Sequence, residues 1–591
     1  MSASSDIDLI KVVDPRIDLH DKLAFEVYCG AQNVTYQQYF RQSASAGSQT
    51  YNIQLPSMDT VISSEVLIRN TITLNISGAP GLGVPLINIG YSDALAPFPY
   101  HQAISVSQSS INNNSVAQNT RDVLAPLLRM LDSRRLQRYN GTCPVMPDVY
   151  QNYGDCVGAV NNPLGSYFNA QDNDIVPRGA FSIDSVAFVS STNAAVPTVA
   201  NGGLTAGNVP VGTVTGGVAD TLVCAVTFTT TEPLLLSPFT YAGMGSQSGM
   251  MGITNLNFIF TTGDWSRCWR AAPFANGNVK TVSYNNIANS YLLIQYLTPH
   301  PSQLKASRNI RPFYTLDRYI TNGGSTIQAN SVGNRFVSNN LQMNGVPDKI
   351  WVVIRKPIAN SNCSNSDSFF PITNVSITFN NLAGILSSAT TEDLFKIGTE
   401  STNQSWQEFQ GYANVNDNLT GAGRKVPLSG GFLCLGMGRD VNLPDEFLAP
   451  NSLGQFNLLV QATFNNNTNQ VLNAGDYEMM IVLQNGGMLV NERGQTAIFQ
   501  QVLTKNSVLD CKQEDSYVTS TELKRMVGKG FLDNMKVHAR RGLSMLPGFA
   551  SKYAKEGLRS LNNPYADAGA QALQDLGMGR KKGGKMQRHL L

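Results

Sequence analysis

The chain has 591 residues, and at roughly 100–200 residues per domain this length predicts two to four domains. Charged residues make up only 14% of the chain, against about 25% in typical domains. Asn, Ser, Thr, Gln and Gly take their place, which argues against long solvated helices and favours strands joined by polar turns. The net charge of +2 hides an asymmetry, because the segment from Lys524 to the end carries fourteen basic and four acidic residues.

The N-terminal residues and the cysteines indicate in which cellular compartment the chain folds. Residues 1–21 are polar and acidic, so we expect no secretory signal, and no run approaches the roughly 18 apolar residues of a membrane span. The eight cysteines have no CxxC spacing. We therefore expect reduced thiols rather than disulfides.

The first half predicts a β domain interrupted by one helix. In residues 66–76 apolar side chains alternate with polar ones such as Arg69 and Asn75, as in a strand that buries one face. Further strands are expected at residues 24–29, 34–40, 50–55, 104–111, 222–230 and 256–260. Val and Leu at helical spacing predict a helix that starts at Asn119 or Thr120 and ends near Asp132, with Pro126 near its first turns. Residues 190–217 predict an exposed loop.

The second half predicts a similar series from about Val279 onward. Strands are expected at residues 291–297, 349–355, 375–380, 456–464 and 477–483. A helical stretch is expected at about residues 391–409, with Leu394, Phe395, Ile397 and Trp406 on its apolar face. Each half thus has strands, a helical insertion and further strands, a repeat of architecture rather than of sequence.

Beyond about residue 519 the chain becomes basic and rich in glycine. Short amphipathic pieces are interrupted by glycines, so we expect a flexible, partly helical or disordered tail. Its basic residues fit three roles: neutralising nucleic acid, contacting a membrane, or anchoring subunits inside a shell. The residues expected to make such contacts are Lys524, Arg525, Lys529, Lys536, Arg540, Arg541, Lys552, Arg580, Lys581, Lys582, Lys585 and Arg588.

Signals of catalysis or of cofactor binding are weak. The five histidines have no metal-ligand spacing, and no phosphate-binding loop motif occurs. The segment 436–438 (Gly-Met-Gly) favours a turn at a strand edge. Trp265 and Trp269, beside Asp264 and Arg270, favour packing over a sugar-binding platform. We therefore predict no catalytic residues, no metal site and no cofactor.

Several segments carry a resemblance to a known family. Residues 384–388 and 393–395, then 433–440, and then the strand 454–464 leading to 477–483 resemble the strand-to-helix passages of double jelly-roll, hexon-like major capsid proteins. In the first half, residues 177–181 and 231–239 are similar in character. The resemblance covers roughly residues 20–510 and is nearest to capsid proteins of small eukaryotic DNA viruses, such as polinton-like or adenovirus-related viruses.

The resemblance implies an all-β chain with two consecutive antiparallel jelly rolls and short helices in loops. The expected divisions are an N-terminal arm at 1–19, a first roll at 20–270, a second roll at 275–515 and the basic tail at 520–591. It also implies a non-enzymatic subunit of an icosahedral virion that self-assembles as pseudo-hexagonal homotrimers with the tail facing inward. Expected partners are further copies of the chain, penton or minor capsid proteins, and the viral genome or an inner membrane; the host receptor is unknown.

Three alternatives remain at this point. A single jelly roll with a projecting domain would keep the shell function. A secreted β-rich adhesin or lectin would suit the Asn-rich loops but not the missing signal and the basic tail. A glycoside hydrolase would need two carboxylates about 5–9.5 Å apart in a cleft, and the sequence nominates no such pair.

Overall fold

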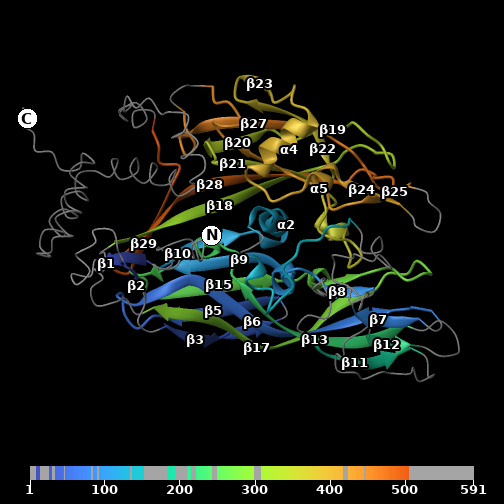
Figure 1. Cartoon of the computed structure of the whole chain (residues 1–591), viewed down its shortest axis with the longest axis horizontal. Helices are drawn as coiled ribbons and strands as arrows, with labels where there is room; N and C mark the ends of the chain where they lie inside the picture. Colours follow the sequence, from blue (N-terminus) through green and yellow to red (C-terminus); the bar gives the residue numbers. More distant parts are fainter. Residues whose placement is uncertain are drawn as a thin grey trace, which may run out of the picture.

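The computed structural model describes most of the chain between residues 8 and 504. The described residues are 8–12, 25–29, 34–45, 47–81, 84–89, 92–132, 136–151, 183–192, 209–213, 221–241, 249–297, 308–416, 423–444 and 448–504. The tail and all twelve of its predicted contact residues lie outside them. The described chain forms two sandwich-like units stacked on each other, the first in blue and green and the second in yellow and orange (Figure 1).

Two facing sheets build the first unit. One sheet has the order β10 (Asn114–Gln118), β9 (Ile104–Ile111), β15 (Asn255–Thr262), β5 (Ser48–Gln54) and β4 (Ser43–Ser45). The other has the order β11 (Ile183–Ser191), β13 (Leu222–Pro233), β6 (Val61–Gly78), β17 (Thr281–Leu297) and β3 (Val34–Phe40), with β14 (Gly249–Met250) beside β6. The predicted alternation is confirmed in β6, where Ile72, Leu74 and Ile76 are buried in the core and Arg69 is exposed.

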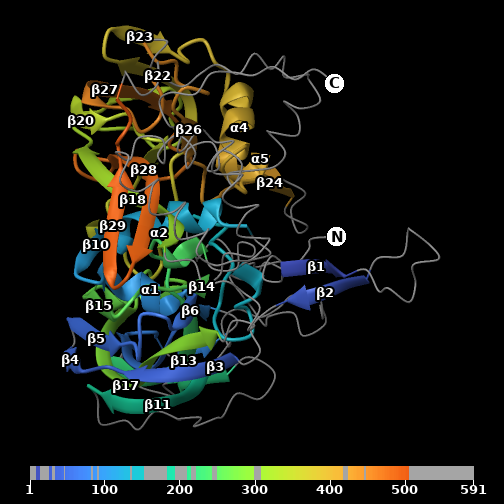
Figure 2. The same cartoon turned by 90° about the vertical axis from the view of Figure 1, so that its left-hand side faces the viewer.

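A small sheet closes one end of this unit. Its order is β12 (Val209–Thr213), β7 (Pro85–Ile89), β8 (Asp93–Leu95) and β16 (Trp269–Ala271). The expectation of a continuous loop at 190–217 was wrong, because β12 pairs antiparallel with β7, a partner far away in sequence. Beneath the sheet, Lys280 Nζ lies 2.6 Å from Asp93, and Trp269 Nε1 donates to the same carboxylate at 3.0 Å. The hairpin of β1 (Asp8–Val12) and β2 (Phe25–Cys29) projects sideways (Figure 2).

The second unit is also a pair of facing sheets. One has the order β18 (Arg308–Asn322), β28 (Glu478–Glu492), β21 (Lys349–Arg355) and β26 (Leu433–Gly436), with β29 (Gln495–Gln500) beside β28. The other has the order β19 (Asn334–Val337), β27 (Leu453–Phe464), β22 (Ile372–Phe379) and β23 (Leu382–Ile385), with β20 (Leu341–Gly345) beside β27. The strands β24 (Tyr412–Asn416) and β25 (Gly423–Pro427) form a separate hairpin. Among the strands named here for the described residues, only β7 and β8 pair in parallel.

Two expectations for the second half need correction. The strand expected at 291–297 belongs to β17 of the first unit, where it pairs with β6 and β3, because Leu292 and Ile294 pack into the first core. The helical stretch 391–409 is two helices, α4 (Thr391–Thr399) and α5 (Trp406–Gln410). Each begins at a capping box, in which the side chain of Thr390 or Ser405 accepts a backbone N–H three residues later, so the second cap starts a new helix.

The first unit contains, among its described residues, the helices α1 (Pro99–Ala103) and α2 (Thr120–Met130). The predicted start of α2 is confirmed, with Asn119 at the N-cap, and Pro126 lies inside the helix. Short 3-10 turns occur at Phe239–Tyr241, Trp265–Cys268 and Ile358–Asn360. In the described part of the chain no helix has the length and apolar character needed to cross a membrane.

Five cysteines with described side chains are buried and unpaired. They are Cys143, Cys224, Cys268, Cys363 and Cys434. Burial raises the pKa of Cys224 and of Cys363 to about 11, and it raises the pKa values of Cys143 and Cys268 well above the usual range. At neutral pH these thiols are therefore protonated as well as inaccessible.

We expect the folded protein at pH 8 to protect these five thiols from iodoacetamide, because the thiolate is the reactive form. After unfolding in guanidinium without reductant, all eight cysteines should be labelled, as counted by mass spectrometry. Reduction before labelling provides the control. A lower count without reductant than with it would contradict the prediction and would indicate disulfides.

Candidate functional site

The two units meet at a face where buried side chains of both pack together, and we call this face the seam. Helix α2 lies in it, between the units (Figure 1). Strand β21 is apolar on both faces: Ile350 and Val352 point into the core of the second unit, whereas Trp351 and Val353 pack toward α2. The apolar side chains that α2 contributes are Val123, Leu124, Leu127 and Leu128. A sheet face that would otherwise meet water is thus covered by the first unit.

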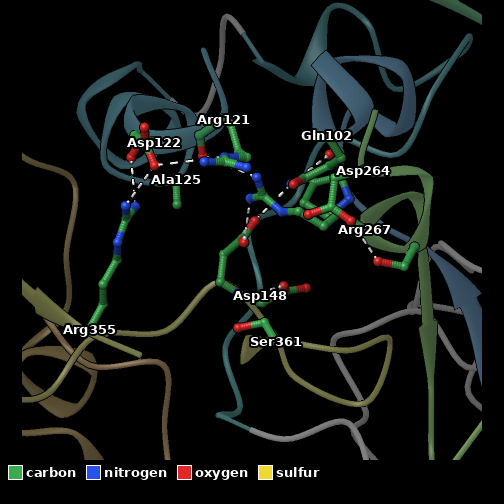
Figure 3. A network of polar contacts seen from close by, with 12 residues as sticks. Gln102, Arg121, Asp122, Ala125, Asp148, Asp264, Arg267, Arg355 and Ser361 are labelled. Carbon is green, nitrogen blue, oxygen red and sulfur yellow. Dashed lines mark hydrogen bonds and ion pairs between the residues drawn. The ribbon is translucent and has the colours of Figure 1, made fainter. Parts of the chain in front are cut away.

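Asp122, in the first turn of α2, is the first polar contact across the seam. Its Oδ1 accepts a hydrogen bond from Arg355 Nη2 at 2.9 Å (Figure 3). Its Oδ2 lies 2.8 Å from Arg318 Nε. Arg355 also donates to the Asp122 carbonyl at 2.8 Å and to Glu478 Oε1 at 2.8 Å. A carboxylate in the first turn is favoured by the helix dipole as well. The helix of the first unit is thereby held in register with strands β18, β21 and β28 of the second.

Asp367, from the loop before β22, is the second polar contact, and it reaches in the opposite direction. Arg267 Nη2 donates to its Oδ1 at 3.0 Å, Arg270 Nη2 lies 3.2 Å from its Oδ2, and Gln102 Nε2 donates to that oxygen at 2.7 Å. Arg270 Nε donates to Asp148 Oδ2 at 3.0 Å, and the Asp367 backbone N–H donates to the same oxygen at 2.9 Å. Each unit therefore supplies a carboxylate to arginines of the other.

The charges in the seam are held in defined protonation states. Burial alone would raise the pKa of Asp367, but the guanidinium groups of Arg267 and Arg270 and the hydrogen bond from Gln102 hold it well below its usual range. Burial lowers the pKa of Arg270, yet Asp148 and Asp367 outweigh this effect and raise it. Carboxylates saturated in this way cannot serve as an acid–base pair. Their arrangement orients two units instead.

Arg129 of α2 completes the polar side of the seam. Its buried guanidinium lies 4.6 Å above the ring of Phe369. It donates to the carbonyls of Asp148 at 3.1 Å and of Asp367 at 2.9 Å. Burial lowers the pKa of Arg129, and the carboxylates of Glu408, Asp367 and Asp148 offset this effect only in part. The residue is a buried cation that ties α2 to loops of both units.

The structure places the remaining sequence candidates in packing roles. Trp265 and Trp269 are buried in the first core, so they form no sugar platform. Gly438 adopts a φ of 78° in a turn after β26, as predicted for that segment. His101 is buried and lies 2.7 Å from Glu232. In the described residues no group of three His, Cys, Asp or Glu side chains is placed to hold a metal.

Sequence reasoning missed the seam. The sequence does contain isolated charged residues next to apolar segments, which could have indicated buried ion pairs. Examples are Asp122 at the start of α2 and Arg355 at the end of an apolar strand. The pattern could not indicate that these two residues, 233 apart in sequence, contact each other.

Comparisons with known proteins agree with this architecture. The family model described as Sputnik virophage major capsid protein 1st domain matches residues 5–299, and the model described as Major capsid protein V20 C-terminal domain matches residues 316–487. The first match thus includes β17, as the strand pairing does. Together the two matches cover most of the chain.

Individual relatives match over nearly their whole length. The putative capsid protein V20 of Sputnik virophage is 26% identical over 612 aligned positions, which cover 98% of this chain and 96% of the relative. A chain in the cryo-EM structure of the Sputnik virophage has a TM-score of 0.70 at 25% identity, with 88% of this chain and 98% of that chain covered. The crystal structure of the mavirus major capsid protein has a TM-score of 0.63 at 15% identity, covers 86% of this chain and 99% of that chain, and shares the fold.

These findings confirm the resemblance given by residues 384–395 and 433–440, and they do not support a single roll with a projecting domain, an adhesin or a hydrolase. Two observations decide the family. The chain folds into two antiparallel rolls joined at the seam, and each roll is matched by one of the two domain models. The chain belongs to the double jelly-roll major capsid proteins, and it is a structural, non-enzymatic subunit of a virion shell.

Proposed function

We propose that the chain builds its shell from homotrimers, in which three subunits present six rolls around a pseudo-hexagonal ring. The observation that carries this proposal is the seam. A ring with near-sixfold outline requires the two rolls of one chain to keep a fixed angle. The paired contacts of Asp122 and Asp367, together with the apolar packing of α2, support such a rigid two-roll block.

The outer face of the first roll is suited to contacts between subunits. Threonine and asparagine side chains pair across its strands: Thr71 lies 3.1 Å from Thr229, Thr73 lies 3.0 Å from Thr227, and Asn285 donates to Asn75 at 2.9 Å. Faces of this kind carry few charges to desolvate, and they form hydrogen bonds and water-mediated contacts. Because one shell repeats each contact many times, modest affinity per contact is sufficient.

The edge strand β3 adds an apolar element to the same sheet. The side chains of Tyr36 and Phe40 are 57% and 63% exposed, and the Phe40 ring packs against Tyr291 with centroids 5.4 Å apart. Within the described residues β3 is the last strand of its sheet, and exposed aromatic side chains at such an edge are typical of subunit contacts. We assign it to the interface between neighbouring copies.

The divisions of the chain and the role of the tail belong to the same proposal. The pairing of β17 with β6 supports a division between the rolls after Leu297, whereas the sequence indicated a division at 270–275. The tail at 520–591 would face inward, where its basic residues would contact the genome, an inner membrane or neighbouring subunits. Penton or minor capsid proteins would complete the lattice.

The proposed trimer is tested by light scattering coupled to size-exclusion chromatography. We expect three chain masses over a range of salt concentrations. The double variant Tyr36→Ser, Phe40→Ser should dissociate more readily. Val332→Ser, which alters a valine that is 76% exposed on the second roll, serves as the matched control and should remain trimeric. A stable monomer of the parent chain under every salt condition would refute the proposal.

The rigid block is tested through Asp367. At neutral pH, Asp367→Asn should lower the free energy of unfolding by about 3–5 kcal/mol, since it leaves Arg267 and Arg270 without their carboxylate. The lowered pKa of Asp367 means that its stabilisation is present above the unfolded pKa of about 3.9 and is lost as the pH falls through the folded value.

Denaturant unfolding between pH 7 and pH 2 should therefore show the parent and Asp367→Asn converging in acid. Asp59→Asn, at an exposed turn, is the control and should parallel the parent at every pH. A difference between the parent and Asp367→Asn that persists unchanged at pH 2 would show that the ion pairs do not carry the effect.

The tail is tested by deleting residues 520–591. The two-roll body should fold and melt like the parent, while assembly, packaging or membrane association is impaired. Nucleic-acid binding by the full chain should weaken steeply with salt, whereas membrane binding through apolar pieces should persist at high salt. Removal of the tail from intact particles by external protease would contradict the inward placement.

A further inference from the structure

A cavity of about 240 Å³ lies in the seam, beside the polar contacts described above. It is bounded by α2, by the loop that connects β21 and β22, by β25 and by the loop after β27. At ~30 Å³ of liquid volume per water molecule, it has room for several waters or for a small polar ligand. A ligand could occupy this cavity without breaking the contacts that hold the two rolls together.

Positively charged side chains outnumber negatively charged ones in the lining of the cavity. Five cations, Arg267, Arg270, Arg355, Lys356 and Lys425, face one carboxylate, Asp367. The three arginines are matched, because each forms an ion pair with one or more of Asp122, Asp148, Asp367 and Glu478. The two lysines therefore provide the excess positive charge of the cavity.

None of the ion pairs in the described part of the chain includes either lysine. Lys356 is half-buried, and its Nζ donates to Asn365 Oδ1 at 3.2 Å. Lys425 Nζ lies 4.5 Å above the Tyr412 ring. Burial lowers the pKa of Lys356, and the more distant Asp476 offsets this only in part. Anionic groups entering the cavity would relieve this desolvation.

We propose that the seam cavity binds a ligand with clustered sulfate or phosphate groups, held by Lys356 and Lys425. Lysine is a mobile point charge that pairs well with such tetrahedral oxyanions. Neutral donors line the remaining wall, among them side chains of Gln151, Ser361 and Gln470. A metal cation is disfavoured, because the single carboxylate is already bound by two arginines. The ligand would bridge loops of both rolls, so its binding would stabilise the seam.

The position of the cavity suggests where such a ligand comes from. Strand β25, which carries Lys425, lies at the end of the molecule opposite to β29, the strand that leads toward the tail (Figure 1). If the tail faces inward, as proposed above, the Lys425 side of the cavity faces the outside of the shell. The source of the anion would then be external, such as a sulfated saccharide, rather than packaged phosphate.

The experiment is lysine footprinting on the full chain. Trace acetylation with and without tripolyphosphate, read by mass spectrometry, should show Lys356 and Lys425 protected about fivefold or more near saturation. Lys396, exposed on α4, should be unchanged and is the internal control. A parallel arm with a sulfated disaccharide distinguishes the two sources, since the better protector identifies the preferred oxyanion. Because the readout is specific to each lysine, anions bound by the basic tail do not contribute to it.

A matched pair of variants completes the test. Lys356→Gln, Lys425→Gln should weaken binding of the protecting anion by about tenfold or more, the loss expected for two charge-assisted contacts, while Lys396→Gln leaves it unchanged. Both variants should melt like the parent without ligand. Equal protection of all three lysines, no protection by either anion, or unaltered affinity in the double variant would overturn the proposal. Because all residues that line the cavity belong to one chain, these measurements do not depend on whether the chain is a monomer or a trimer, or on the direction of the tail.

Discussion

The burial of one sheet on both of its faces determines how the two rolls are arranged. The sheet β18–β28–β21–β26 contributes one apolar face to the core of the second roll and the other to the seam, where α2 of the first roll covers it. Without the first roll, Trp351, Val353, Met480 and Val482 would be exposed to water. At roughly 25 cal/mol per Å² of apolar surface, such exposure is strongly unfavourable, so the second roll is not an independent unit. The seam belongs to the folding of the chain as much as to its assembly.

The ion pairs of the seam fix the relative orientation of the two rolls, which the apolar contact alone does not. Apolar packing tolerates sliding, whereas an arginine–carboxylate pair is satisfied at one geometry only. Asp122 of the first roll binds arginines of the second, and Asp367 of the second binds arginines of the first, so the two contacts oppose rotation of one roll against the other. Buried ion pairs contribute little net stability compared with apolar replacements. Their value in a shell subunit is the fixed angle between rolls that repeated packing requires.

The distribution of charge follows from the same requirement. Several full charges are buried and paired in the seam, while the outer face of the first roll presents paired threonine and asparagine side chains. Uncharged polar faces can approach one another without desolvating ions, which suits contacts that are individually weak and numerous. The seam cavity departs from this pattern, because Lys356 and Lys425 bring charge without carboxylate partners.

Local patterns were sufficient to predict many of the strands, the start of α2 and the class of fold. The alternation in β6 and β27 depends only on which residues lie two positions apart, and the position of α2 depends on apolar residues that recur at helical spacing. Resemblance in residues 384–395 and 433–440 gave the family. The sequence did not determine that β17 belongs to the first roll, that β12 is a strand, or that Asp122 meets Arg355. These features depend on partners distant in the chain, since a strand becomes stable only when another strand is beside it and a buried charge is tolerated only when its counter-ion is in place.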